Sequence, residues 1–139
     1  MVKFRRILLT PKTRKLLVAL QKTCLPYDSV YTETKAWYWI GYWNGTPIAF
    51  CVLAPSLRWA DCVYLARAGV VREFRGRGLQ KKMISIRERW ARKQGYKWIV
   101  SDTTENPASA NSLIGRGYKI YEPSNPWGFK HSLYWRKRL

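Results

Sequence analysis

The chain has 139 residues, and its 26 lysines and arginines outnumber 8 aspartates and glutamates, so its formal net charge is +18. This length supports one hydrophobic core, and no linker or repeat divides the sequence, so we expect a single domain over residues 1–139. No apolar run reaches the roughly 18 residues that a membrane span needs, and the three cysteines lack metal-ligand spacing. The composition therefore predicts neither a membrane protein nor a metal site.

The first elements predicted along the chain are a strand and a helix. Val2 to Leu9 is predicted as a strand. Thr10 then supplies a helix cap, Pro11 suits the first helical position, and Pro26 ends the helix.

A hairpin and a long strand are predicted next. An aromatic-rich strand over residues 36–43 is followed by Asn44-Gly45, the strongest short hairpin signal, and residues 46–54 return as the next strand. A buried strand is predicted over the apolar residues 63–71. Three consecutive antiparallel strands are the simplest interpretation.

The second half of the chain alternates helices and strands. The sequence predicts a helix over residues 77–93, a strand over residues 97–101, a helix that begins at Asn106 and ends at Gly115 or Gly117, strands over residues 118–121 and 132–135, and a basic tail over residues 136–138. The whole order predicts an α/β fold with a mixed, mostly antiparallel central sheet and helices on both of its faces.

The cellular compartment is predicted from the N-terminus and the cysteines. The apolar stretch Ile7 to Leu9 is too short for a secretion signal, and Cys24, Cys51 and Cys62 suit reduced thiols. We therefore expect a cytoplasmic protein.

The loop Arg75-Gly76-Arg77-Gly78 joins a predicted strand to a predicted helix and has the chemistry of an anion site. Backbone N–H groups at a helix start have no intrahelical acceptor, and the helix dipole favours negative charge there. The glycines let a bulky anion approach the main chain, and the arginines add positive charge and donors suited to phosphate. An ordinary strand–helix turn is the alternative interpretation of the loop by itself.

The residues from Val70 to Leu79 resemble the pyrophosphate-binding motif of the GNAT superfamily of acyl-CoA N-acyltransferases. A second motif, Asn106-Pro107-Ala108-Ser109 followed by Leu113 and Gly117-Tyr118, resembles the fourth helix and sixth strand of that family. The ending Leu133 to Lys137 is similar to small bacterial and phage members. The resemblance implies acetyl-CoA as donor and a slot for it between the fourth and fifth strands. It also implies the cofactor-binding residues Val70, Val71, Arg75, Gly76, Arg77, Gly78, Leu79, Asn106 and Ser109.

The resemblance also implies candidates for the chemistry. Backbone amides near Val70 and Val71 correspond to the donors that polarise the thioester carbonyl. The family's usual tyrosine acid is replaced by Leu113, which cannot donate a proton. Tyr64 and Asp102 are the candidates for orienting or removing a proton, and a core hydroxyl and a strand-end carboxylate are the alternative interpretation of these two residues.

Two functions remain open on the sequence. The first is an N-acetyltransferase that transfers acetyl directly from acetyl-CoA to an amine of a protein, a small molecule or an aminoacyl-RNA in a ternary complex. The second is a non-catalytic GNAT-fold module that binds nucleic acid or an acidic protein through its basic surface. We expect no membrane partner, and either a monomer or a homodimer.

Overall fold

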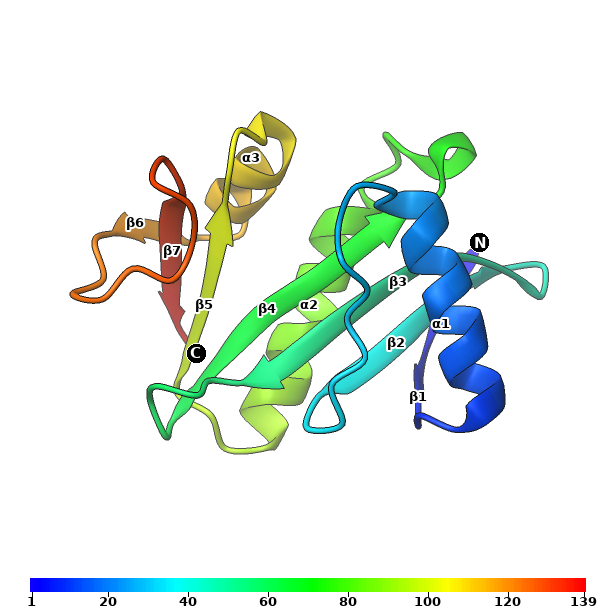
Figure 1. The fold of residues 1–139 in the computed structure, drawn as a ribbon, viewed down its shortest axis with the longest axis horizontal. Coiled ribbons are helices and arrows are strands. Elements are labelled where there is room, and N and C mark those ends of the chain that lie inside the picture. Colours follow the sequence, from blue (N-terminus) through cyan, green and yellow to red (C-terminus); the bar gives the residue numbers. More distant parts are fainter. The chain divides into compact units, whose positions relative to one another are not determined.

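The computed structural model describes all 139 residues, and the order of its elements is the predicted one. Between β4 and α2 lies a short 3₁₀ helix, Arg72–Phe74, that the sequence analysis did not predict. The elements (Figure 1) are β1 (Val2–Ile7), α1 (Pro11–Cys24), β2 (Trp37–Trp43), β3 (Thr46–Pro55), β4 (Cys62–Val70), α2 (Leu79–Lys93), β5 (Trp98–Thr103), α3 (Pro107–Gly115), β6 (Lys119–Tyr121) and β7 (Leu133–Arg138). None of the helices combines the length and the apolar character that crossing a membrane requires.

The strands form one seven-stranded sheet in the order β1-β2-β3-β4-β5-β7-β6. The β1–β2, β2–β3, β5–β7 and β6–β7 pairs are antiparallel, whereas β4 and β5 are parallel, which confirms the predicted mixed sheet. The ladder between β4 and β5 joins residues 62–64 to residues 98–100. It ends there, although β4 continues to Val70 and β5 to Thr103.

The chain forms two compact units. The first unit contains Met1–Ala54 and Ala66–Leu79, and the second contains Pro55–Leu65 and Gln80–Leu139. Strand β4 contributes residues to both units, so no single point of the chain separates them.

The core of the first unit packs α1 against β2 and β3. Thr10 caps the helix, since its hydroxyl accepts from the Thr13 N–H at 3.2 Å. The buried face of the helix carries Leu17, Leu20 and Cys24, which cluster with apolar side chains of β2 and β3. A Cβ at Gly69 would lie 2.6 Å from the Cβ of Cys24, so only glycine lets the end of α1 approach β4 this closely.

The hairpin between β2 and β3 has the predicted turn. Asn44 and Gly45 have φ values of 46° and 79°, which is the pair of positive angles that a two-residue type I′ turn requires. The turn twists the two strands so that they pair from Trp37 opposite Leu53 to Trp43 opposite Thr46.

In the second unit, α2 contacts β7 through a buried carboxylate. Glu88 on α2 is only 1% exposed, and its carboxylate accepts a 3.0 Å hydrogen bond from the Lys137 ammonium and lies 3.7 Å from the Arg116 guanidinium. Since side chains alternate along a strand, Arg136 and Arg138 face away from α2.

The predicted basic tail is therefore wrong, because β7 continues to Arg138. Arg136 and Arg138 lie opposite Val100 and Trp98 of β5 in the strand register. In the sequence, three consecutive basic residues indicate a solvent-exposed end. In the structure the buried Glu88 carboxylate neutralises Lys137, and Arg136 and Arg138 lie over the Trp98 ring.

Candidate functional site

The glycine loop leads from β4 into α2 in a conformation that presents backbone donors. Gly76 and Gly78 have φ values of 77° and 75°, in the left-handed region that favours glycine. The N–H groups of residues 76–79 donate to no carbonyl outside a helix or strand, and the first amides of α2 have no acceptor within the helix. Such a concave set of N–H groups at the positive end of a helix dipole binds phosphate oxygens.

The two arginines of this loop bind the chain's own carbonyl groups. The Arg75 Nε donates to the Val70 carbonyl at 3.0 Å, and its Nη2 donates to the Cys24 carbonyl at 3.5 Å. The Arg77 Nη2 donates to the Glu73 carbonyl at 3.4 Å, and its guanidinium carbon lies 4.7 Å from the centre of the Phe74 ring. Both side chains therefore fix the loop, while their charges remain beside its exposed N–H groups.

The two valine amides proposed as oxyanion donors differ in availability. The Val71 N–H donates to the Ile48 carbonyl of β3 at 2.9 Å, so it is already engaged. Backbone N–H groups of successive strand residues point to opposite edges. The Val70 N–H therefore points away from β3, and of the two it is the one that fits the role.

The structure brings together Tyr64 and Asp102, the two residues that the family resemblance indicates for the proton. The Tyr64 hydroxyl donates to the Asp102 Oδ1 at 2.6 Å, between β4 and β5, and both residues are half-buried. The Trp127 ring, from the loop between β6 and β7, meets the Tyr64 ring edge to face at 6.3 Å. The pair is therefore a hydrogen-bonded hydroxyl and carboxylate beside aromatic rings.

The second motif lies at the start of α3. The Asn106 Oδ1 accepts from the Ser109 N–H at 3.1 Å, so it caps this helix, and its amide NH₂ remains for another partner. Leu113 is 4% exposed and belongs to the core of the second unit. The position of the family's tyrosine is thus filled by an apolar core side chain.

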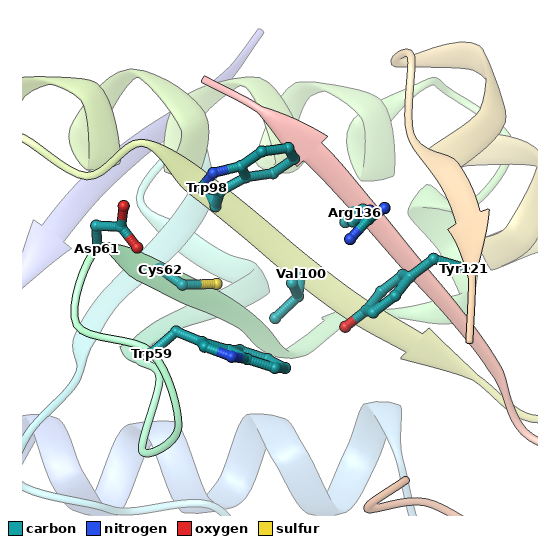
Figure 2. A pocket seen from close by; sticks show the side chains of 7 residues that line it. All are labelled: Trp59, Asp61, Cys62, Trp98, Val100, Tyr121 and Arg136. Carbon is teal, nitrogen blue, oxygen red and sulfur yellow. The ribbon is translucent and has the colours of Figure 1, made fainter. Parts of the chain in front are cut away.

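The second unit contains a cavity that the sequence does not predict. A cavity of about 210 Å³ opens on the face of β4, β5 and β7 that carries Cys62, Val100 and Arg136, and Trp59 and Tyr121 border it (Figure 2). Trp59 comes from the loop before β4. A tryptophan within a turn-rich segment was the available signal, but nothing in the sequence places it beside β5 and β6.

Comparison with known proteins agrees with this geometry. The model of the acetyltransferase (GNAT) family matches residues 16–118. Among solved structures, the GNAT domain of S. lividans PAT is 14% identical with a TM-score of 0.77, over 99% of this chain and 90% of that one. An IAA acetyltransferase from Bacillus cereus is 15% identical with a TM-score of 0.74, over the whole of both chains.

A third structure, an N-acetyltransferase from Staphylococcus aureus, is 15% identical with a TM-score of 0.75, over 98% of each chain. No curated protein sequence matches the chain. At these identities the structures establish the fold, whereas the family model matches the segment that contains both the glycine loop and the start of α3. With its two glycines at positive φ before α2 and its parallel β4–β5 pair, the chain belongs to the GNAT family of acetyltransferases.

Proposed function

We propose that the chain is an acetyl-CoA-dependent N-acetyltransferase that transfers the acetyl group directly to an amine in a ternary complex. The acceptor amine belongs to a protein, a small molecule or an aminoacyl-RNA. The observation that carries this proposal is the loop before α2, in which two glycines at positive φ present free N–H groups. Membership of the family supplies the reaction class.

The donor is held by backbone groups in this proposal. The amides of residues 76–79 bind the pyrophosphate, and the side chains of Arg75 and Arg77 hold the loop in shape. The free NH₂ of Asn106 meets a carbonyl of the pantetheine arm, with Ser109 beside it at the helix start. The N–H of Val70 stabilises the negative charge that develops on the thioester oxygen.

The transfer forms a C–N bond and breaks the C–S bond of the thioester. The amine must first lose a proton, because an ammonium has no lone pair. In this proposal the Tyr64 hydroxyl, which donates to Asp102, and the Asp102 carboxylate orient the amine or a water that carries the proton away. The Asp102 carboxylate attracts the acceptor in its ammonium form, and the proton then leaves to water before the C–N bond forms.

No side-chain acid is required for the leaving group. A thiol has a pKa of about 8.5, so CoA leaves as a thiolate and then takes a proton from water. Leu113 therefore does not prevent the reaction. The three free, buried cysteines fit the reduced conditions of the cytoplasm, where acetyl transfer to such an amine would take place.

The proposal is tested by measuring acetyl-CoA binding and thiol release separately. Calorimetry with acetyl-CoA should show one site per chain, and a thiol-reactive dye should report CoA released in the presence of an acceptor panel of polyamines, basic peptides and aminoacylated tRNA. Acetyl-CoA binding without thiol release from any acceptor would favour the non-catalytic module. Failure to bind acetyl-CoA at millimolar concentration would overturn the proposal.

A further inference from the structure

The lining of the cavity in the second unit contains none of the residues assigned to acetyl transfer. It lies on the sheet face opposite α2, since Arg136 faces away from the helix that Lys137 contacts. Its volume of about 210 Å³ is below the range of roughly 300–1,000 Å³ for sites that enclose a drug-sized ligand. The cavity therefore fits a single ring system that enters from a larger molecule.

Three aromatic side chains and Arg136 line the cavity, and a second arginine, Arg138, lies beside one of the rings. The Arg136 guanidinium carbon lies 4.7 Å from the centre of the Tyr121 ring and 5.7 Å from that of Trp98, and Arg138 lies 5.4 Å from Trp98. Trp59, on the opposite side of the cavity from Arg136, is 40% exposed (Figure 2). Planar groups stack on such surfaces, and the adjacent guanidinium groups bind phosphate.

A polar atom within this cavity lacks a partner. The Tyr121 hydroxyl oxygen is buried but forms no hydrogen bond, and Figure 2 shows it directed into the cavity, toward Val100 and Trp59. An unpaired buried hydroxyl is costly, so a ligand with a polar ring atom would bind better than a hydrocarbon ring. Burial raises the pKa of this phenol, so it remains a neutral donor and acceptor.

Two other polar residues of the cavity, Cys62 and Asp61, further restrict the class of ligand that fits it. Burial, followed by the nearby Asp61 carboxylate, raises the pKa of the Cys62 thiol to about 12, so this thiol is neither charged nor nucleophilic at neutral pH. The backbone of Asp61 is fixed, because its main-chain carbonyl accepts from the N–H groups of Lys97 and Trp98 at 2.9 and 3.1 Å. A carboxylate beside stacking rings accepts from the exocyclic amino group of a base.

We propose that this face binds single-stranded nucleic acid, with one base in the cavity against Trp59 and Tyr121 and the neighbouring phosphates on Arg136 and Arg138. The exposed Lys119, which lies opposite Arg136 in the β6–β7 register, extends the cationic surface along the strand. Because the base must be unpaired to enter, a duplex binds less tightly. These three cationic side chains account for part of the net charge of +18, which CoA binding alone does not require.

The test compares fluorescein-labelled oligonucleotides by anisotropy over a salt series. Wild type should bind a 20-nucleotide oligo(C) more tightly than the duplex of that sequence. Trp59→Ala should weaken oligo(C) binding by about 5- to 150-fold, the loss of one stacked base. Arg136→Gln with Arg138→Gln should reduce the slope of log affinity against log salt by roughly 1.4, whereas Lys12→Gln with Lys15→Gln, which removes the same charge from α1, should leave the slope unchanged.

Two further variants separate base recognition from fold and from bulk charge. Tyr121→Phe removes an unpaired hydroxyl, so the melting temperature should stay the same or rise while oligo(C) affinity falls by about fivefold. Asp61→Ala should lower the ratio of oligo(C) to oligo(U) affinity, because the loss of one negative charge affects both polymers equally and cancels in the ratio.

Equal affinity for single strand and duplex, together with unchanged binding by Trp59→Ala and Tyr121→Phe, would overturn the proposal. It would leave a diffuse electrostatic surface for an acidic partner. None of these measurements requires acetyl transfer. A negative result would therefore reject the nucleic-acid proposal and leave the proposed acetyltransferase activity untouched.

Discussion

The hydroxyl of Tyr64 on β4 donates a 2.6 Å hydrogen bond to the carboxylate of Asp102 on β5. The two residues are 38 positions apart in the sequence, and the parallel pairing of Tyr64 with Val100 brings them together. A phenol and a carboxylate held side by side can together orient a proton donor such as an amine or a water. This arrangement is the basis for the proposed role of the pair at the acceptor amine.

Removing either member of this pair should slow acetyl transfer and leave acetyl-CoA binding intact. We expect Tyr64→Phe and Asp102→Asn each to lower kcat by about 10²-fold or more, the lower end of what one positioned proton acceptor contributes. Stopped reactions with a thiol-reactive dye measure kcat, and calorimetry measures the acetyl-CoA dissociation constant.

A matched control is Tyr134→Phe, because the rings of Tyr64 and Tyr134 both contact the Trp127 ring. Its ring lies 4.6 Å from that of Trp127, and its hydroxyl accepts from the Gly128 N–H at 2.8 Å. Losing this hydroxyl should lower stability and leave kcat within about twofold, since no proton role is assigned to it. Equal kcat losses in Tyr64→Phe and Tyr134→Phe would show that Tyr64 only supports the cluster.

Acetyl-CoA affinity should depend on Gly78 through its place in the loop. Gly78→Val should lower the affinity by at least about tenfold, because a branched side chain at φ 75° distorts the backbone that presents the N–H groups. Gly95→Val is the matched control. Gly95 has φ 89°, and a Cβ at either glycine would meet no other atom within 4 Å, but Gly95 lies after α2.

Both variants should lose similar stability in urea unfolding, because both force a side chain into the left-handed region. Only Gly78→Val should lose acetyl-CoA affinity in calorimetry. A similar loss of affinity in both variants would mean that stability, and not the loop geometry, determines binding.

The sequence predicted the order of elements because each boundary has a local cause. Thr10-Pro11 begins α1 and Asn44-Gly45 forms the turn of the hairpin through the chemistry of these few residues. The predicted end of β7 was wrong because the causes of its true end are not local. Residues 136–138 pair with residues 98–100 of β5, and Lys137 contacts the buried Glu88, and both of these partners lie far away in the sequence.

The candidate site also has parts that follow from local sequence and parts that follow from contacts between distant residues. The glycine loop and the Asn106 cap are contiguous motifs, so the sequence could indicate them. The cavity near Trp59 depends on a loop that meets β5, β6 and β7, which no local pattern predicts. The engagement of the Val71 amide by Ile48 likewise follows from sheet pairing and could not be foreseen from the motif.

Replacing Leu113 by tyrosine should cost stability and should not increase turnover. Leu113 is 4% exposed, so a larger ring overpacks the core by about 1–3 kcal/mol, and a hydroxyl placed there has no partner. Leu113→Phe is the control, because it adds the same ring without the hydroxyl. If Leu113→Tyr turns over faster than Leu113→Phe in the thiol-release assay, the hydroxyl reaches the leaving group and the core assignment of this position is wrong.

Stability should fall at high pH because of Cys62. Burial raises the pKa of its thiol from 9.0 to about 12, so the folded chain holds this proton more tightly than the unfolded chain does. The contribution is therefore complete below about pH 9 and is lost as the pH rises toward about 12.

Urea unfolding at about pH 8, 9.5 and 10.5 measures the free energy of unfolding. Cys62→Ala removes the titrating group, so its unfolding free energy should fall less steeply than that of wild type between the two higher pH values. Identical slopes for the two proteins would show that the thiol of Cys62 ionises as easily in the folded chain as in the unfolded one.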